Sequence, residues 1–283
     1  TDPDDVAAIL FTSGATGPPK GVVYRHRHFA AQVEMIGGMY GIEQGEIDLP
    51  TFPLFALFDP ALGMTTVIPR MNFTKPAAVD PTEIIGAVQR FKATNMFGSP
   101  ALLDVVSSYA ADHQIRLPTL RRVITAGAPV RTDILRRARL MIAEDGCIHT
   151  PYGATENLPV ATIESREVLA ETAAQTAAGA GVCVGVPHPR NDVRIMQIAA
   201  EPAGPRQTGE PQARFITTLA HGQIGEITCR GPSTTDTYFG LSEQTNRAKI
   251  EEPEGVRHRM GDAGYLDAQG RLWYCGRLAH RLQ

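Results

Sequence analysis

Lysine and cysteine are both scarce in this sequence of 283 residues. Only four lysines occur, and the remaining basic side chains are arginines that lie scattered along the chain. The 27 basic and 30 acidic side chains leave a net charge of -3, which predicts neither a nucleic-acid-binding surface nor nucleic acid as a partner. The four cysteines, Cys147, Cys183, Cys229 and Cys275, lie far apart and form no Cys-x-x-Cys pair. This spacing predicts a reduced, cytoplasmic protein without structural zinc.

Long hydrophobic runs are missing as well. No apolar stretch approaches the length of about 20 residues that a membrane-spanning helix needs, so we expect no transmembrane segment. The first five residues are mostly acidic, unlike a signal peptide. A hydrophobic share of 43% and a charged share of 20% are typical of a globular protein, and the length allows one large domain or a domain with a subdomain.

The most informative stretch is the sequence FTSGATGPPKGV at residues 11–22. It is rich in glycine and hydroxyl side chains, contains Lys20, and lies between two apolar runs, so it predicts two strands joined by a polar loop. Glycine exposes backbone N–H groups, and Lys20 adds a positive charge, so the loop suits a polyphosphate. A nucleotide-binding loop followed by a helix would need Gly-Lys-Ser/Thr, whereas Lys20 stands between Pro19 and Gly21. The alternative is a surface hairpin without a ligand.

Strand and helix signals alternate after this loop. Short apolar segments at residues 64–68, 96–98, 122–126 and 147–150 predict strands, and the stretches between them predict helices. Such alternation favours an α/β fold, with mostly parallel sheets and flanking helices. Beyond about residue 180 the pattern changes to short strands and turns. Strands are expected at residues 182–186, 192–198, 224–230 and 264–274, and a mobile loop at residues 201–213, which together predict a smaller β-rich subdomain. We therefore expect two domains, residues 1–180 and residues 181–283.

Two polar motifs directly follow predicted strands, where ligands bind in such sheets. Ala126-Gly127-Ala128-Pro129 has small side chains that let a flat ring lie against the backbone. Tyr152-Gly153-Ala154-Thr155-Glu156 combines an aromatic ring, a hydroxyl and a carboxylate. This set suits a nucleotide that stacks on Tyr152, contacts Thr155 through a phosphate, and shares Mg²⁺ with Glu156.

Other candidates have two interpretations. The aromatic run at residues 52–58 is interrupted by Pro53, so it is not expected to form a regular strand, and one interpretation of it is core. His26 and His28 form a possible metal pair, although surface histidines explain them better. His149 is either a structural residue or a catalytic base.

These motifs, in this order, resemble those of the adenylate-forming synthetases, the superfamily of acyl-CoA ligases, luciferases and peptide-synthetase adenylation domains. Met260-Gly261-Asp262 resembles the superfamily's ribose motif, and Gly276-Arg277 resembles the start of its hinge. The resemblance covers nearly the whole chain and implies the core of the superfamily's large domain. It also implies that an N-terminal region and a C-terminal lid domain with a catalytic lysine are absent from this sequence.

The resemblance implies a role for each motif residue, with ATP and Mg²⁺ as cofactors. Lys20, Thr155 and Glu156 would be catalytic, and Glu156 would bind the metal. The ATP phosphates would contact Thr12, Ser13, Gly14, Ala15, Thr16, Gly17, Lys20 and Thr155. The adenine would lie against Ala126, Gly127, Ala128, Pro129, Tyr152 and Gly153. The ribose would be bound by Asp262 and Arg277. The aromatic run at residues 52–58 would form the wall of an apolar substrate pocket, because the matching region of the superfamily lines the acyl pocket.

Several stretches, among them residues 11–26 and 150–161, are similar to the OleC-type olefin β-lactone synthetases. This similarity implies that a long-chain 2-alkyl-3-hydroxy acid reacts with ATP to give an acyl-adenylate, and that its own hydroxyl then displaces AMP to close a β-lactone. The partners would be the acyl substrate, ATP and other enzymes of the olefin pathway. One alternative is a long-chain fatty acyl-CoA ligase or acyl-AMP ligase, the former of which would use coenzyme A. Another is a non-catalytic fragment that binds nucleotide or acyl groups.

Overall fold

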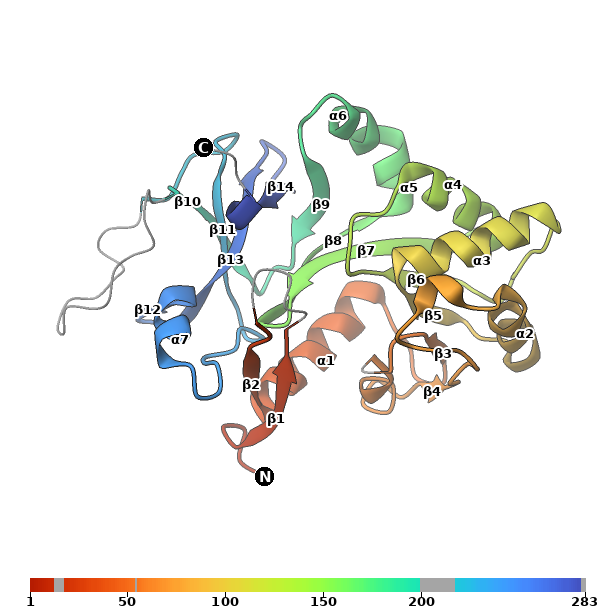
Figure 1. Ribbon diagram of the computed structural model, residues 1–283, viewed down its shortest axis with the longest axis horizontal. Helices are drawn as coiled ribbons and strands as arrows, with labels where there is room; N and C mark the ends of the chain where they lie inside the picture. The colour runs from red at the N-terminus through yellow and green to blue at the C-terminus, as the bar shows by residue number, and fades with distance from the viewer. Residues whose placement is uncertain (13–17, 54, 199–216, 281–283) are drawn as a thin grey trace. The chain divides into compact units, whose positions relative to one another are not determined.

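The computed structural model describes residues 1–12, 18–53, 55–198 and 217–280. The chain forms two compact units, and each is assembled from separate stretches of sequence (Figure 1). The first unit contains residues 1–35, 152–162 and 179–283, and the second contains residues 36–151 and 163–178. The division of the chain at residue 180 stays a prediction.

The second unit contains a parallel sheet flanked by helices. Its strands are β3 (Ile47–Pro50), β4 (Thr65–Thr66), β5 (Asn95–Gly98), β6 (Arg122–Thr125) and the first part of β7 (Cys147–Ala154). They lie in the order β7-β6-β5-β3-β4, and every pair is parallel. Its helices are α2 (Pro81–Phe91), α3 (Pro100–Asp112), α4 (Thr132–Met141), α5 (Ser165–Glu167) and α6 (Ala173–Ala177), and it includes the end of α1 (His26–Tyr40). The predicted α/β class with flanking helices is confirmed.

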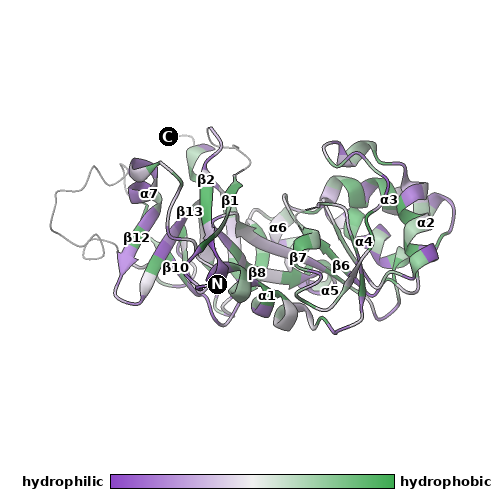
Figure 2. Cartoon of the chain, turned by 90° about the horizontal axis from the view of Figure 1, so that it is seen from below, coloured by the Kyte–Doolittle hydropathy of each residue, from purple (hydrophilic) through white to green (hydrophobic). Residues whose placement is uncertain are grey.

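Local sequence signals explain where two of these helices begin. The Asp80 side chain accepts a hydrogen bond from the backbone N–H of Thr82 at 2.9 Å, and Pro81 occupies the first helical position of α2. Ser99 accepts from the backbone N–H of Leu102 at 3.3 Å in front of α3. Helices α2, α3 and α4 carry both hydrophilic and hydrophobic residues (Figure 2). Their apolar side chains join strand residues in one buried core, which includes Leu49, Ile84, Leu102, Val123, Leu135 and Ile148.

The first unit is mainly antiparallel. Its larger sheet has the order β10-β11-β13-β14-β9-β8, and β12 pairs with β13. The strands are β8 (Asn157–Glu164), β9 (Val182–Pro187), β10 (Asp192–Met196), β11 (Gly225–Arg230), β12 (Lys249–Glu252), β13 (Gly255–Leu266) and β14 (Leu272–Arg277). A separate hairpin consists of β1 (Val6–Phe11) and β2 (Gly21–Arg25), and α7 (Ser242–Ala248) precedes β12.

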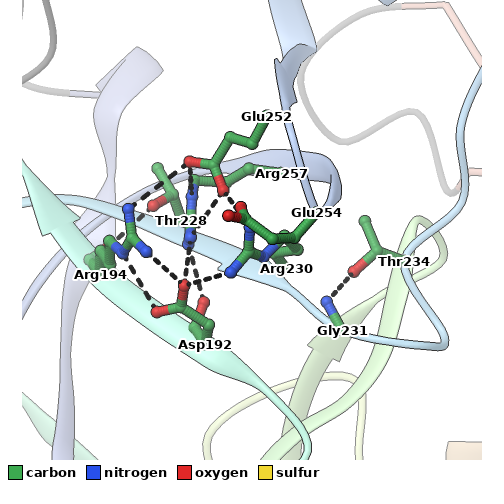
Figure 3. A network of polar contacts seen from close by, with 9 residues as sticks. All are labelled: Asp192, Arg194, Thr228, Arg230, Gly231, Thr234, Glu252, Glu254 and Arg257. Atoms are coloured by element: carbon green, nitrogen blue, oxygen red, sulfur yellow. Dashed lines mark hydrogen bonds and ion pairs between the residues drawn. The ribbon is translucent and has the colours of Figure 1, made fainter. Parts of the chain in front are cut away.

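A buried ion-pair network ties several strands of this sheet together. The fully buried Arg257 on β13 lies 2.6 Å from Asp192 of β10 and 2.7 Å from Glu252 of β12 (Figure 3). An unpaired charge at this depth would be strongly destabilising, so the two carboxylates are needed to hold the arginine inside. The network fixes the strand from which Asp262 projects.

Some expected elements differ from the structure. Residues 264–274, expected as one extended strand, form the end of β13, a turn and the start of β14. The turn is closed by Asp267, whose N–H donates to the Arg271 carbonyl, and Gly270 adopts a φ of +76° there. The strand expected at residues 64–68 is only Thr65–Thr66, and β8 was not expected at all. The loop expected at residues 201–213 lies outside the described residues. Among the helices in the described part of the chain, none has the length and apolar character to cross a membrane.

Candidate active site

The hairpin β1–β2 brings Thr12 and Lys20 together at the base of the predicted phosphate loop. The Thr12 N–H donates to the Lys20 carbonyl at 3.0 Å, and the Lys20 N–H donates to the Thr12 hydroxyl at 3.1 Å. The predicted pair of strands is confirmed, and the Thr12 hydroxyl keeps its own proton for a ligand. The phosphate-binding residues Ser13, Gly14, Ala15, Thr16 and Gly17 lie outside the described residues, so their roles stay predictions.

The Lys20 ammonium lies against the ring of Tyr238. Its Nζ is 5.1 Å from the ring centroid, within the distance of a cation–π interaction. The ring is 4% exposed and packs in a small core with Val22 and Tyr24. The Lys20 amine is therefore held at a defined place rather than extended into solvent.

Glu156 occupies the turn between β7 and β8 and is held at both its carboxylate and its backbone. The Tyr238 hydroxyl donates to Oε1 of Glu156 at 2.6 Å. The backbone N–H and the hydroxyl of Thr235 donate to the Glu156 carbonyl at 3.0 and 2.9 Å. The Tyr24 hydroxyl donates to the carbonyl of Thr155 at 2.6 Å, which fixes the other residue of the turn.

Burial and the nearby Glu156 carboxylate raise the pKa of Tyr238 far above that of an exposed tyrosine. The hydroxyl therefore keeps its proton and acts as a donor to Glu156.

Lys249 is a second amine at this place, and the sequence did not point to it. Its side chain is 4% exposed, and its Nζ donates to the carbonyl and the hydroxyl of Thr235 at 2.5 and 3.2 Å. Nζ also lies 6.0 Å from the centroid of the Tyr238 ring. Burial lowers the pKa of Lys249 to about 7, although the negative charges of Glu156 and Asp236 oppose this shift. The available signal was a lone lysine between Ala248 and Ile250, in a chain with few lysines.

Asp262 and Arg277, the predicted ribose pair, are direct neighbours across β13 and β14. Nη1 of Arg277 lies 3.1 Å from Oδ1 of Asp262. The hydroxyl of Tyr152 donates to the other oxygen, Oδ2, at 2.6 Å. The structure thus joins a residue predicted to bind adenine to the residue predicted to bind ribose.

The buried carboxylate of Asp262 retains capacity to bind a ligand. Asp262 is 3% exposed, and its Oδ1 accepts no hydrogen bond from the described residues even though Arg277 lies within ion-pair distance. Burial raises the pKa of Asp262, while Tyr152 and Arg277 oppose the shift. A buried acceptor without a donor is costly, and a hydroxyl of a bound ligand would supply the missing donor to Oδ1.

The donor set also fits a magnesium ion that is shared with phosphates. Among the described residues, no group of three or more His, Cys, Asp or Glu side chains could hold a metal ion by itself. Mg²⁺ needs only one or two protein carboxylates when substrate phosphates supply further oxygens. The Glu156 carboxylate therefore suits a metal that arrives with a nucleotide.

The predicted adenine residues are divided between the units. In the second unit, β6 is directly followed by Ala126, Gly127, Ala128 and Pro129. Gly127 has a φ of +101°, a backbone conformation that residues other than glycine rarely adopt. Tyr152 and Gly153 belong to the first unit. A Cβ on Gly153 would lie 2.7 Å from Cδ1 of Leu158, so the packing of β8 by itself requires glycine there. A common adenine site for these six residues stays a prediction.

The other candidates have local structural partners. His28 is buried, and its Nδ1 accepts from the Arg25 N–H at 3.1 Å, so a surface location for His28 is wrong. His149 packs against the Tyr40 ring at 5.0 Å between centroids, and burial lowers its pKa. The described residues of the aromatic run 52–58 are half-buried or exposed, so none of them belongs to the buried core. A pocket wall remains the prediction for that run.

Comparison with known proteins gives consistent matches. A family profile described as AMP-binding enzyme matches residues 1–239. An olefin beta-lactone synthetase of Stenotrophomonas maltophilia is 53% identical over 288 residues, which cover all of this chain and 50% of that protein. A feruloyl-CoA synthase of Amycolatopsis is 28% identical, covering 97% of the chain and 50% of that protein.

Among solved structures, the amide bond synthetase McbA of Marinactinospora thermotolerans superposes with a TM-score of 0.73 and 26% identity. The match covers 96% of the chain and 49% of McbA. The chain thus spans about half the length of these relatives.

Proposed function

The chain belongs to the family of AMP-binding enzymes, and from this premise we propose that it is part of an ATP-dependent synthetase that activates a carboxylic acid as its acyl-adenylate. The proposed substrate is a long-chain 2-alkyl-3-hydroxy acid, and the proposed product is a β-lactone for olefin biosynthesis. The observation that carries this proposal is the match to an olefin beta-lactone synthetase along the whole chain. The partners would be ATP, the acyl substrate, and the enzymes that supply the hydroxy acid and consume the lactone.

The described residues of the first unit would bind the nucleotide at two places. Lys20 and the Thr12 hydroxyl would contact the triphosphate, together with Thr155, because an ammonium group and hydroxyl donors stabilise phosphate charge. Glu156 would hold Mg²⁺, which supplies charge neutralisation at the phosphate oxygens when bound. Asp262 would accept hydrogen bonds from the ribose hydroxyls, supported by Tyr152 and Arg277.

In the first reaction, a carboxylate oxygen of the acid attacks the α-phosphorus of ATP, and the bond to the β-phosphate oxygen breaks. Pyrophosphate leaves, and the acid becomes a mixed anhydride with AMP. Lys20 stabilises the negative charge that grows on the phosphate oxygens, and a charged hydrogen bond of this kind contributes roughly 1.5–3 kcal/mol.

In the second reaction, the 3-hydroxyl oxygen of the same molecule attacks the activated carbonyl carbon. The C–O bond to AMP breaks, AMP leaves, and the hydroxyl proton passes to a base. The nucleophile is attached to the electrophile, so no second substrate has to be bound.

The decisive experiment uses the full-length enzyme with ATP, Mg²⁺ and a 2-alkyl-3-hydroxy acid, with and without coenzyme A. We expect AMP, pyrophosphate and β-lactone in equal amounts by mass spectrometry, with no requirement for coenzyme A. Failure of the hydroxy acid to yield lactone, while other acids yield thioester, would reject the proposal.

A second candidate is an acyl-CoA ligase, which the similarity to a feruloyl-CoA synthase favours. In that case coenzyme A would be the nucleophile, and a thioester would form only when it is present. A non-catalytic nucleotide-binding protein would instead bind ATP without exchanging labelled pyrophosphate into it.

A further inference from the structure

The backbone around Tyr238 is attached to the strand that follows Lys20. Tyr238 forms a bridge with Val22 of β2, the Phe239 N–H donates to the Gly21 carbonyl at 2.7 Å, and the Val23 N–H donates to the Thr237 carbonyl at 3.1 Å. These bonds hold the backbone of Tyr238 beside β2, and its side chain is buried in a small core with Val22 and Tyr24. Backbone pairing and side-chain packing together therefore set the position of the ring.

The Tyr238 side chain contacts both charged groups that the proposed function uses. Its ring lies 5.1 Å from Nζ of Lys20, and its hydroxyl lies 2.6 Å from Oε1 of Glu156. The two interactions use different parts of one rigid side chain. The ring sets where the cation is, and the hydroxyl sets where the carboxylate is.

Lys249 and Thr235 support the same arrangement from within the unit. The Lys249 amine binds the Thr235 carbonyl and hydroxyl, and Thr235 in turn holds the Glu156 backbone. Two of the four lysines in the sequence thus lie near one tyrosine ring. Tyr238, Lys249 and Glu156 are buried polar or charged residues that hold one another in place, so the removal of one side chain is expected to disturb the positions of the others.

We propose that Tyr238 is the positioning residue of the adenylation site: its hydroxyl orients the Glu156 carboxylate, and its ring holds the Lys20 amine. This inference rests on the proposed function, in which Glu156 meets the metal and Lys20 meets the phosphates. Partners of a metal-binding side chain commonly affect metal affinity or activity by about 10- to 100-fold. Tyr238 acts through the two charged residues and does not itself need to touch ATP.

The test compares Tyr238→Phe with Tyr265→Phe in the full-length enzyme. Tyr265 is the matched control because it lies in the same unit as Tyr238 and its hydroxyl also donates a hydrogen bond. The acceptor is the Ala180 carbonyl at 3.0 Å, a backbone group rather than a carboxylate. Mn²⁺ serves as the probe metal, and its affinity in the presence of ATP is measured by electron paramagnetic resonance. We expect Tyr238→Phe to weaken Mn²⁺ binding by about tenfold and Tyr265→Phe to leave it within about twofold of wild type.

A second variant, Tyr238→Leu, removes the ring as well. We expect it to weaken ATP binding beyond the loss in Tyr238→Phe, because Lys20 loses its contact. Equal metal affinity in Tyr238→Phe, Tyr265→Phe and wild type would overturn the inference. Glu156→Gln and Lys20→Ala distinguish a failure of the proposed function from a failure of the positioning role. If these two variants leave pyrophosphate exchange intact, the proposed function fails. If they abolish exchange while Tyr238→Phe behaves like the control, only the positioning role fails.

Discussion

The Tyr238 hydroxyl donates a hydrogen bond to Oε1 of Glu156 over 2.6 Å, although the two residues lie 82 positions apart in the sequence. Tyr238 is 4% exposed and Glu156 is 9% exposed. A buried carboxylate without a donor would be costly, so the pair stabilises the turn that carries Glu156. Substitutions at Glu156 must therefore preserve an acceptor if their effect on chemistry is to be separated from their effect on folding.

Glu156→Gln meets this condition, because the amide oxygen can still accept from Tyr238. We expect pyrophosphate exchange to fall by more than about tenfold, since the variant loses the negative charge that is proposed to hold Mg²⁺. The melting temperature should stay close to that of wild type. Glu83→Gln, a change at an exposed residue, is the control. Normal exchange in Glu156→Gln would contradict the metal role.

Lys20→Ala removes the cation at the end of the phosphate loop. We expect pyrophosphate exchange to fall by more than about tenfold, because one charged contact to the phosphates is lost. Lys75→Ala, at an exposed lysine, should leave the exchange rate unchanged. Similar rates in the two variants would show that Lys20 does not act on ATP.

Asp262→Asn converts the carboxylate to an amide, so an NH₂ donor replaces one of the two acceptor oxygens. We expect the KM for ATP to rise about tenfold with a smaller change in maximal rate, because the loss concerns binding of the ribose. The measurement is steady-state release of pyrophosphate at varied ATP concentration. Tyr152→Phe should have a smaller effect, because both carboxylate oxygens remain. An unchanged KM in Asp262→Asn would rule out ribose binding there.

Asp48→Asn should change how stability depends on pH. Asp48 and Asp59 are buried, and their carboxyl groups share a hydrogen bond. Burial, together with the Asp59 charge, raises the pKa of Asp48 to about 8. The folded state therefore binds more protons than the unfolded state between about pH 4 and pH 8, so its stability falls as the pH rises through this range.

The variant lacks this titration, and its amide can still donate to Asp59. Between pH 5.5 and pH 8.5, we expect its free energy of unfolding to fall by about 3 kcal/mol less than that of wild type. Urea unfolding at the two pH values measures the difference. Asp112→Asn, at an exposed aspartate, should behave like wild type. Parallel pH dependences in wild type and Asp48→Asn would contradict a shared proton.

The local elements followed from the sequence because their signals act within a few residues. The Asp80 and Ser99 side chains each accept a hydrogen bond from a backbone N–H in the first turn of a helix, and the proline that follows each of them suits the first helical position. The polar loop between two apolar runs connects the strands of the β1–β2 hairpin. The order of the motifs along the chain was also sufficient to indicate the family, which the comparisons established. The turn at Asp267 was missed because the apolar residues on both sides of it favour continuous strand.

The sequence by itself determined the α/β class, the helices and strands with strong local signals, and the order of motifs that indicates the family. The tertiary structure alone decided that Tyr238 and Lys249 lie beside Glu156, and that Tyr152 reaches Asp262 from 110 positions away. Strand register and burial bring such residues together. The few residues on either side of a tyrosine or a lysine do not indicate which distant strand it will contact. Local propensities fix each element, whereas these contacts depend on how distant strands pair and pack.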